Sequence, residues 1–164
     1  MITKNDSEII QDWDHIDNED IKVVCEILRK HTKNISDYLV ALVASLCGVE
    51  VKDMMTRTDK INIVHSRWLY WYAYRYMSGE AYGSMRERMS EWGRGFTEQS
   101  ISDSVNKMGA MITQSNTWAK RWSILKKIIK LREEANKEES KAQYKISITI
   151  PKDLKNKVEI EYKD

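Results

Sequence analysis

Histidine, cysteine and paired carboxylates are the side chains in this sequence that could perform acid–base, nucleophilic or metal chemistry. The histidines and cysteines are His15, His31, His65, Cys25 and Cys47. No histidine lies three or four residues from another histidine or from a cysteine, so the spacing of a zinc site does not occur. The carboxylate pairs at 133–134 and 138–139 lie in a charged stretch typical of a solvated helix. Glycine-rich nucleotide-binding motifs are also missing. We therefore expect no enzyme, no metal and no cofactor.

A second kind of chemistry is available between residues 97 and 107, where the polar side chains can bond the edges of base pairs. The amides of Gln99 and Asn106 can each pair with adenine. The carboxylate of Glu98 can accept a bond from cytosine N4, or it can simply stabilise a helix N-terminus. Asp103 can accept the same bond from cytosine N4, and Ser100 and Ser102 can bond either a base or a phosphate. The acids oppose a phosphate field, which counts against DNA binding.

The segment 84–113 has the sequence pattern of a helix-turn-helix. A helix is predicted from Ser84, a turn at Gly93 and Gly95 follows, and Thr97 is a good N-cap for the next helix. Apolar residues recur on one face of that second helix, at Ile101, Val105, Met108 and Ile112. In DNA-binding proteins of this type the second helix enters the major groove.

Charge is distributed unevenly along the chain, although the formal net charge is only +2. Residues 1–20 contain seven acids and one lysine, a net charge of −6. Residues 52–132 contain 15 bases and seven acids, a net charge of +8, and 118–132 contains six bases and no acid. A basic middle with an acidic amino end indicates a nucleic-acid binder with a competing arm, or a solvated surface that keeps the protein in solution.

The length of 164 residues fits one domain, and the scarcity of glycine and proline predicts long helices. We divide the chain into an acidic leader with a first helix (1–35), a helical helix-turn-helix domain (36–140) and a tail (141–164). Ser36 is a candidate N-cap, and Gly48 and Gly79 are placed to end helices. A long basic helix is predicted from about Asn116 to Ser140.

The tail alternates apolar and polar residues. One run contains Tyr144, Ile146, Ile148 and Ile150, and the other contains Val158, Ile160 and Tyr162. Alternation of this kind predicts a β-hairpin, which would pack on the helices or extend a sheet with a second chain. The expected fold class is therefore mainly α, a helical bundle with a C-terminal β-hairpin.

Six of the ten residues of 67–76, RWLYWYAYRY, are aromatic. On a helical period they point in every direction. The segment is therefore either a central helix surrounded by the others or an exposed aromatic face for single-stranded bases or a partner.

Residues 39–112 resemble the carboxy-terminal DNA-binding domain of the bacterial replication initiator DnaA, a helical domain akin to the Trp repressor. The resemblance is carried by VEVKDMM (49–55), IVHSRWLYWYA (63–73), MSEWGRGF (89–96) and QSISDSVNKM (99–108). It implies a helix-turn-helix fold and binding to duplex DNA.

The resemblance also implies roles for individual residues. Arg67 matches the family's arginine that enters the minor groove, although a surface ion pair would equally explain it. Arg57 and Lys60 stand in for a more basic loop. The family's base-reading turn becomes RGFTEQS at 94–100, so the initiator's recognition sequence is not carried over.

Two functions follow. The first is a double-stranded DNA-binding regulator or replication accessory, of a mobile element, in the bacterial cytoplasm or nucleoid. The residues expected to contact DNA are Arg57, Lys60, Arg67, Arg94, Thr97, Glu98, Gln99, Ser100, Ser102, Asn106 and Lys107. The second is a protein–protein interaction module that has lost DNA binding. A homodimer through the last helix and the hairpin is compatible with both, and no apolar run is long enough for a membrane span.

Overall fold

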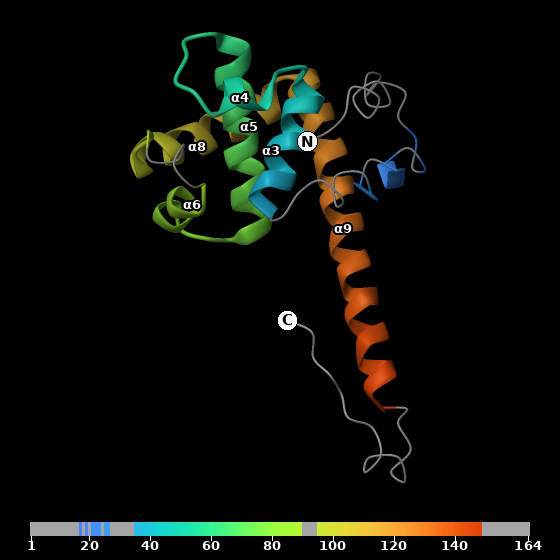
Figure 1. Cartoon of the computed structure of the whole chain (residues 1–164). Coiled ribbons are helices and arrows are strands. Elements are labelled where there is room, and N and C mark those ends of the chain that lie inside the picture. The colour runs from blue at the N-terminus through green and yellow to red at the C-terminus, as the bar shows by residue number, and fades with distance from the viewer. Residues whose placement is uncertain are drawn as a thin grey trace. The chain divides into compact units, whose positions relative to one another are not determined.

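A computed structural model describes the central part of the chain and a few residues near its beginning. The described residues are 17, 19, 21–23, 25–26, 35–89 and 95–148, with side chains as far as residue 138. The chain divides into two compact units, Met1–Ile129 and Lys130–Asp164. The helices are α3 (Ile35–Cys47), α4 (Val51–Met54), α5 (Ile61–Ser78), α6 (Tyr82–Arg88), α8 (Glu98–Gln114) and α9 (Asn116–Ile148) (Figure 1). The mainly helical prediction is confirmed.

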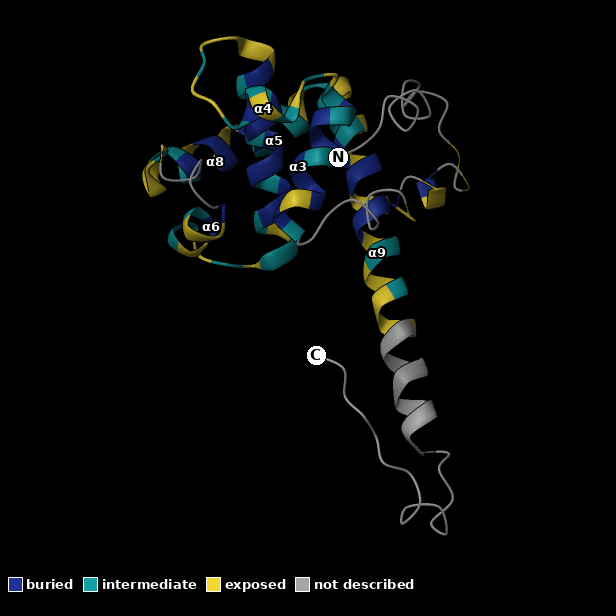
Figure 2. Ribbon diagram, in the orientation of Figure 1, coloured by how far each residue is buried: buried dark blue, intermediate teal, exposed yellow. Residues whose placement is uncertain are grey.

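Helix α5 is the central helix of the first unit and packs against both α3 and α8. Leu69, Tyr70 and Ala73 are completely buried, and Figure 2 shows buried residues along both α3 and α5. Ser36 was expected to cap a helix, but it lies inside α3 and is buried there. Its Oγ lies 2.7 Å from the Tyr70 hydroxyl, so this buried phenol has a hydrogen-bond partner.

Two short helices complete the packing around α5. Helix α4 packs on α3 and α5 and contributes the fully buried Met54. Helix α6 packs on α8 and α5 and contributes Met85. Met89 follows α6, and its sulfur accepts a hydrogen bond from Trp71 Nε1 at 3.1 Å. Flexible methionines therefore fill the gaps between α5 and its shorter neighbours.

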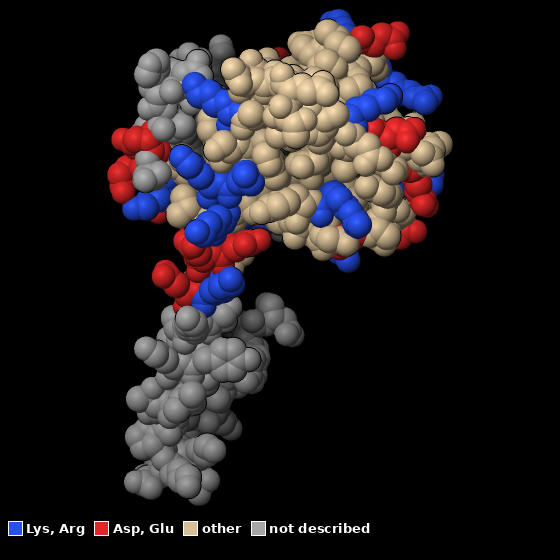
Figure 3. All heavy atoms as spheres, turned by 180° about the vertical axis from the view of Figure 1, so that it is seen from behind, with Lys and Arg blue, Asp and Glu red and all other residues tan. Residues whose placement is uncertain are grey.

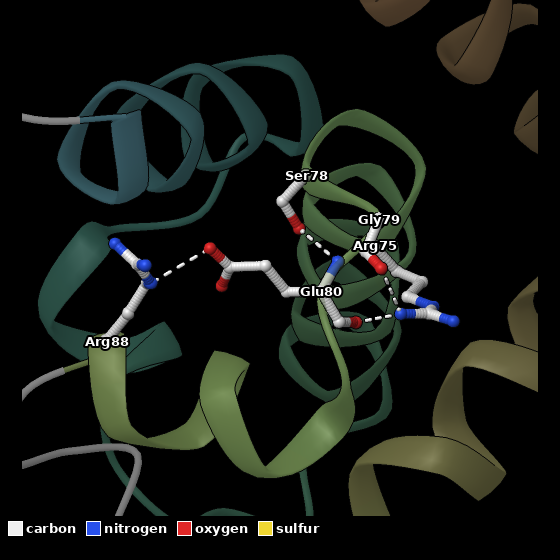
Figure 4. A network of polar contacts seen from close by, with 5 residues as sticks. All are labelled: Arg75, Ser78, Gly79, Glu80 and Arg88. Atoms are coloured by element: carbon white, nitrogen blue, oxygen red, sulfur yellow. Dashed lines mark hydrogen bonds and ion pairs between the residues drawn. The ribbon is translucent and has the colours of Figure 1, made fainter.

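A polar network ties the end of α5 to α6 (Figure 4). Arg75 Nη1 donates to the carbonyl of Gly79 at 2.8 Å and also to that of Glu80. The backbone N–H of Glu80 donates to Ser78 Oγ at 3.2 Å. The Glu80 carboxylate pairs with Arg88 Nε at 2.9 Å, and Arg88 is the last residue of α6. The network satisfies carbonyls that a helix end leaves unbonded and orients α6.

The first part of α9, as far as Ile129, belongs to the first unit. Its buried side chains are Trp122, Ile124, Leu125, Ile128 and Ile129. The Trp122 ring makes edge-to-face contacts with Tyr72 and Tyr76 of α5, each at 5.0 Å between centroids. These contacts join α9 to α5 through aromatic rings.

In the second unit, α9 continues from Lys130 to Ile148. Its described side chains, as far as residue 138, are exposed or half-buried. Lys130 and Glu134 form an ion pair one turn apart, with 3.9 Å between Nζ and Oε1.

The predicted C-terminal β-hairpin is wrong. Tyr144, Ile146 and Ile148 of its first strand belong to α9, and the residues that the structure describes contain no strand. Ile150, the last residue of that strand, lies outside the described residues. The alternating pattern includes an i, i+4 pair, Tyr144 and Ile148, which a helix accommodates equally well. Extending an existing helix adds one hydrogen bond per residue, whereas a new hairpin must first be nucleated. The second run, 158–162, lies outside the described residues.

None of the helices within the described residues is long and apolar enough to cross a membrane.

Gly79 ends α5 in the left-handed conformation, with φ of 64°, as the sequence predicts, and Gly48 does the same after α3 with φ of 65°. No atom lies within 4 Å of a Cβ built at Gly79, so a substitution there tests the backbone alone. We predict that Gly79→Ala lowers the free energy of unfolding by about 1–2 kcal/mol, and Gly79→Asn by less. Urea unfolding followed by circular dichroism measures both.

The matched control is Gly109→Ala, which makes the same change inside α8. The added Cβ would lie 3.4 Å from the Tyr72 ring, an ordinary contact, and alanine favours a helix over glycine. We expect this variant to be neutral or more stable. Equal losses of unfolding free energy in both variants would show that the positive φ of Gly79 is not the cause.

Candidate nucleic-acid interface

Helices α6 and α8 pack against each other in chain order, as a helix-turn-helix requires. Thr97 is the N-cap of α8, as predicted, and its side chain accepts a hydrogen bond from the Ser100 N–H at 3.1 Å. The Ser100 hydroxyl donates to the Thr97 carbonyl at 2.8 Å. These two predicted DNA contacts therefore also serve the first turn of α8. Arg94 lies outside the described residues.

The two sides of α8 differ sharply. Ile101, Val105 and Met108 are buried, whereas Gln99 and Asn106 are exposed. Ser102 is half-buried between them in sequence, so the positions i, i+3 and i+7 form one outward stripe of polar side chains. This stripe, Gln99–Ser102–Asn106, is called the α8 polar stripe below.

Two carboxylates border the α8 polar stripe. Asp103 Oδ1 accepts a hydrogen bond from the Gln99 amide at 2.8 Å, which orients that amide. Glu98 lies against α6, because a Cβ built at Gly83 would come within 2.8 Å of Glu98 Oε1. The positive charge of Lys107 is exposed, and its Nζ lies 5.4 Å from the centroid of the Trp68 ring.

Arg57 and Lys60 are exposed on the connection between α4 and α5. Lys60 is the N-cap of α5 but makes no capping hydrogen bond with its side chain, and its backbone N–H donates to Thr58 Oγ1 at 3.2 Å. These two side chains are the cations through which the connection could meet a phosphate.

Arg67 is buried, with 4% of its surface exposed. Its Nε donates to the carbonyl of Met54 at 2.7 Å, and its Nη2 donates to the carbonyl of Thr56. Its guanidinium also lies over the Phe96 ring, 4.8 Å from the centroid. Burial lowers the pKa of Arg67 from its ordinary value, which still leaves it charged at neutral pH. The structure thus places Arg67 between the α4–α5 connection and the turn before α8, bonded to backbone rather than extended into solvent.

An open depression of about 610 Å³ lies beside this arginine, between the α4–α5 connection and the first turns of α8. Its lining residues are Arg57, Thr58, Asp59, Val64, Arg67, Trp68, Trp71, Phe96, Ser100 and Ser104. Three of the predicted DNA contacts, Arg57, Arg67 and Ser100, therefore meet here. The other predicted contacts among the described residues lie outside its lining.

Trp68, Asp59 and Phe96 line this depression but were not among the predicted site residues. Trp68 belongs to the RWLYWYAYRY segment, for which an exposed aromatic face was one of the two interpretations. Asp59 and Phe96 carry no such signal, because only the fold brings their loops together. Within the described residues no three histidine, cysteine or acidic side chains are grouped to bind a metal ion.

The aromatic segment proves to be both central and partly exposed. Tyr70, Trp71 and Tyr74 are buried, Trp68 and Tyr72 are half-buried, and Tyr76 is exposed. The segment is therefore buried on one side of α5 and partly exposed on another.

Comparison of the chain with protein-family models, with curated proteins and with solved structures finds no match.

We predict that Arg67→Ala lowers the free energy of unfolding by about 2–4 kcal/mol, because it leaves two backbone carbonyls without their charged donor. Arg67→Lys should recover only part of this loss, since an ammonium lacks the planar fork that reaches both carbonyls. Urea unfolding measures both variants.

The control is Arg57→Ala, which removes an exposed arginine from the same depression and should change stability by no more than about 0.5 kcal/mol. If Arg67→Ala unfolds at the same urea concentration as the wild type, the bonds to Met54 and Thr56 contribute nothing to stability.

Proposed function

We propose that the protein binds double-stranded DNA through α8 and acts as a sequence-specific regulator or replication accessory of a mobile element. The α8 polar stripe is the observation that carries the proposal. Gln99 and Asn106 are the side chains best suited to adenine in the major groove, and both are exposed on a capped helix. The packing of α6 against α8, which a helix-turn-helix also has, is the second support.

Exposed cations lie on the same unit as the stripe. Arg57 and Lys60 lie on the α4–α5 connection, and Lys107 follows Asn106 on α8. On the first part of α9, Lys120, Lys126 and Lys127 are exposed. Contacts of these side chains with phosphates would position the protein and supply the salt-dependent part of the affinity.

In this proposal Arg67 does not enter the minor groove of DNA, which is the role that the resemblance implies. Its bonds to Met54 and Thr56 hold the connection that presents Arg57. We therefore assign it to positioning, and Arg57 and Lys60 to direct phosphate contact.

A second candidate is a protein–protein interaction module on the same scaffold. The observation in its favour is the pair of carboxylates beside the stripe. Asp103 already bonds the Gln99 amide, and Glu98 adds a second negative charge where a phosphate strand would approach. A partner protein would tolerate these charges better than DNA would.

Selection from a pool of random duplexes, followed by fluorescence anisotropy at 50–200 mM salt, tests the proposal. We predict that Asn106→Ala weakens binding to the selected sequence by about 5- to 150-fold, which corresponds to the loss of one bidentate base contact. Its affinity for random duplex should stay unchanged. Arg57→Ala should instead weaken binding to all duplexes alike. It should also lower the slope of log affinity against log salt concentration by about one.

Gln114→Ala is the matched control, since it removes an exposed amide from the last residue of the same helix. It should bind like the wild type. A pool that yields no preferred sequence, together with no binding at 50 mM salt, would exclude DNA and favour the interaction module.

A further inference from the structure

A continuous series of aromatic rings and cations crosses three helices on one side of the first unit. Lys107 of α8 lies over the Trp68 ring of α5, with 5.4 Å from Nζ to the centroid. Trp68 lies 4.9 Å from the His65 ring, and His65 lies 5.8 Å from Trp118 of α9. The guanidinium of Arg121 lies 4.7 Å from the centroid of Trp118. These five residues are called the aromatic–cation series.

The series is accessible to solvent. Trp68, His65, Trp118 and Arg121 are half-buried, and Lys107 is exposed. These side chains pack on the fold and still present part of their surface to a ligand.

A second aromatic cluster continues along the same side of α5. Tyr72 and Tyr76 contact Trp122, and Lys126 Nζ lies 5.7 Å from the centroid of that ring. Tyr76 is 61% exposed. Residues 65, 68, 72 and 76 of α5 are three or four positions apart, so they form one stripe that α8 and α9 flank.

Carboxylates are missing from the segments that carry this face. Helix α5 contains no aspartate or glutamate, nor do residues 104–114 of α8 or residues 116–129 of α9. Figure 3 shows the molecule from behind, turned by 180° from Figure 1. A broad area without charged side chains is visible there, bordered by Lys and Arg and also by Asp and Glu. The face therefore combines positive charge with flat apolar rings.

We propose that this face binds single-stranded nucleic acid, with bases stacked on Trp68 and Trp118 and phosphates paired with Lys107, Arg121 and Lys126. A polyanion that carries planar rings matches both features of the face, whereas an acidic peptide would match only the charge. A duplex is a poorer fit because its bases are stacked on each other and hide their faces.

The cation–aromatic contacts seen in the structure are compatible with the stacking of bases on the same rings. An exposed cation–π contact is weaker than the stacking of a base on an aromatic side chain. A base can therefore displace Lys107 or Arg121 from its ring, and the displaced cation can then pair with the adjacent phosphate. The proposal does not depend on base recognition by the α8 polar stripe, because Gln99, Ser102 and Asn106 are not part of this face. Lys107 and Lys126 are phosphate contacts in both proposals.

The test is the binding of a labelled 20-nucleotide oligothymidine to the full chain at 50 mM salt, followed by anisotropy and by quenching of tryptophan fluorescence. Thymine is used because single strands of it form little structure of their own. We predict that Trp118→Ala weakens binding by about 5- to 150-fold, the loss expected for one stacked base, while Trp118→Phe retains most of the affinity. Arg121→Ala should weaken binding and reduce its salt dependence.

Two controls separate this face from the rest of the molecule. Lys52→Ala removes an exposed lysine of α4 that is paired with Glu50, and it should leave binding unchanged. Asn106→Ala should leave oligothymidine binding unchanged even if it impairs duplex binding, so that the two proposals can fail independently. Circular dichroism and urea unfolding confirm that each variant is folded, and Arg121→Ala, which leaves every ring in place, decides the matter if Trp118→Ala does not fold.

Three outcomes would overturn the proposal. The first is no binding of oligothymidine at 50 mM salt. The second is equal affinity of the wild type, Trp118→Ala and Arg121→Ala. The third is displacement of oligothymidine by an equal charge concentration of polyglutamate, which would show attraction by charge alone or a preference for an acidic protein.

Discussion

Helix α5 carries large side chains around its whole circumference, so most of its surface must be covered by other helices. Leu69, Tyr70 and Ala73 are completely buried, with α3 and α8 packed on the helix. The short helix α4 packs on α3 and α5, α6 packs on α8 and α5, and the rings of α9 cover a further side. The place of α8, and with it the α8 polar stripe, therefore depends on the burial of α5.

A single buried arginine then relates the parts of the candidate interface to one another. Arg67 extends from α5, bonds the backbone at Met54 and Thr56, and stacks on Phe96 in the turn before α8. The exposed cations of the α4–α5 connection are thereby held at a set distance from the start of α8. Such preorganisation reduces the conformational entropy that is lost when a ligand binds both parts.

Local signals in the sequence predicted the local features of the structure. Gly79 at the end of α5 and Thr97 at the start of α8 follow from residue type, because each feature depends on a few neighbouring atoms. The hairpin at 141–164 was wrong because the alternation of Tyr144, Ile146 and Ile148 is also compatible with a helix. The position of Arg67 could not be predicted, since its partners come from an element 13 residues away and from a turn after α6.

The contact between Gly83 and Glu98 has an electrostatic consequence. The Glu98 carboxylate occupies space that a side chain at position 83 would need, with 2.8 Å from its Oε1 to a Cβ built there. Because the end of a glutamate is flexible, any larger residue at 83 would displace this charge instead of moving the helix. The absence of a side chain at position 83 thus leaves room for a negative charge against α6 at the N-terminus of α8. Glycine at this position therefore affects the electric potential around the start of α8, although it carries no charge itself.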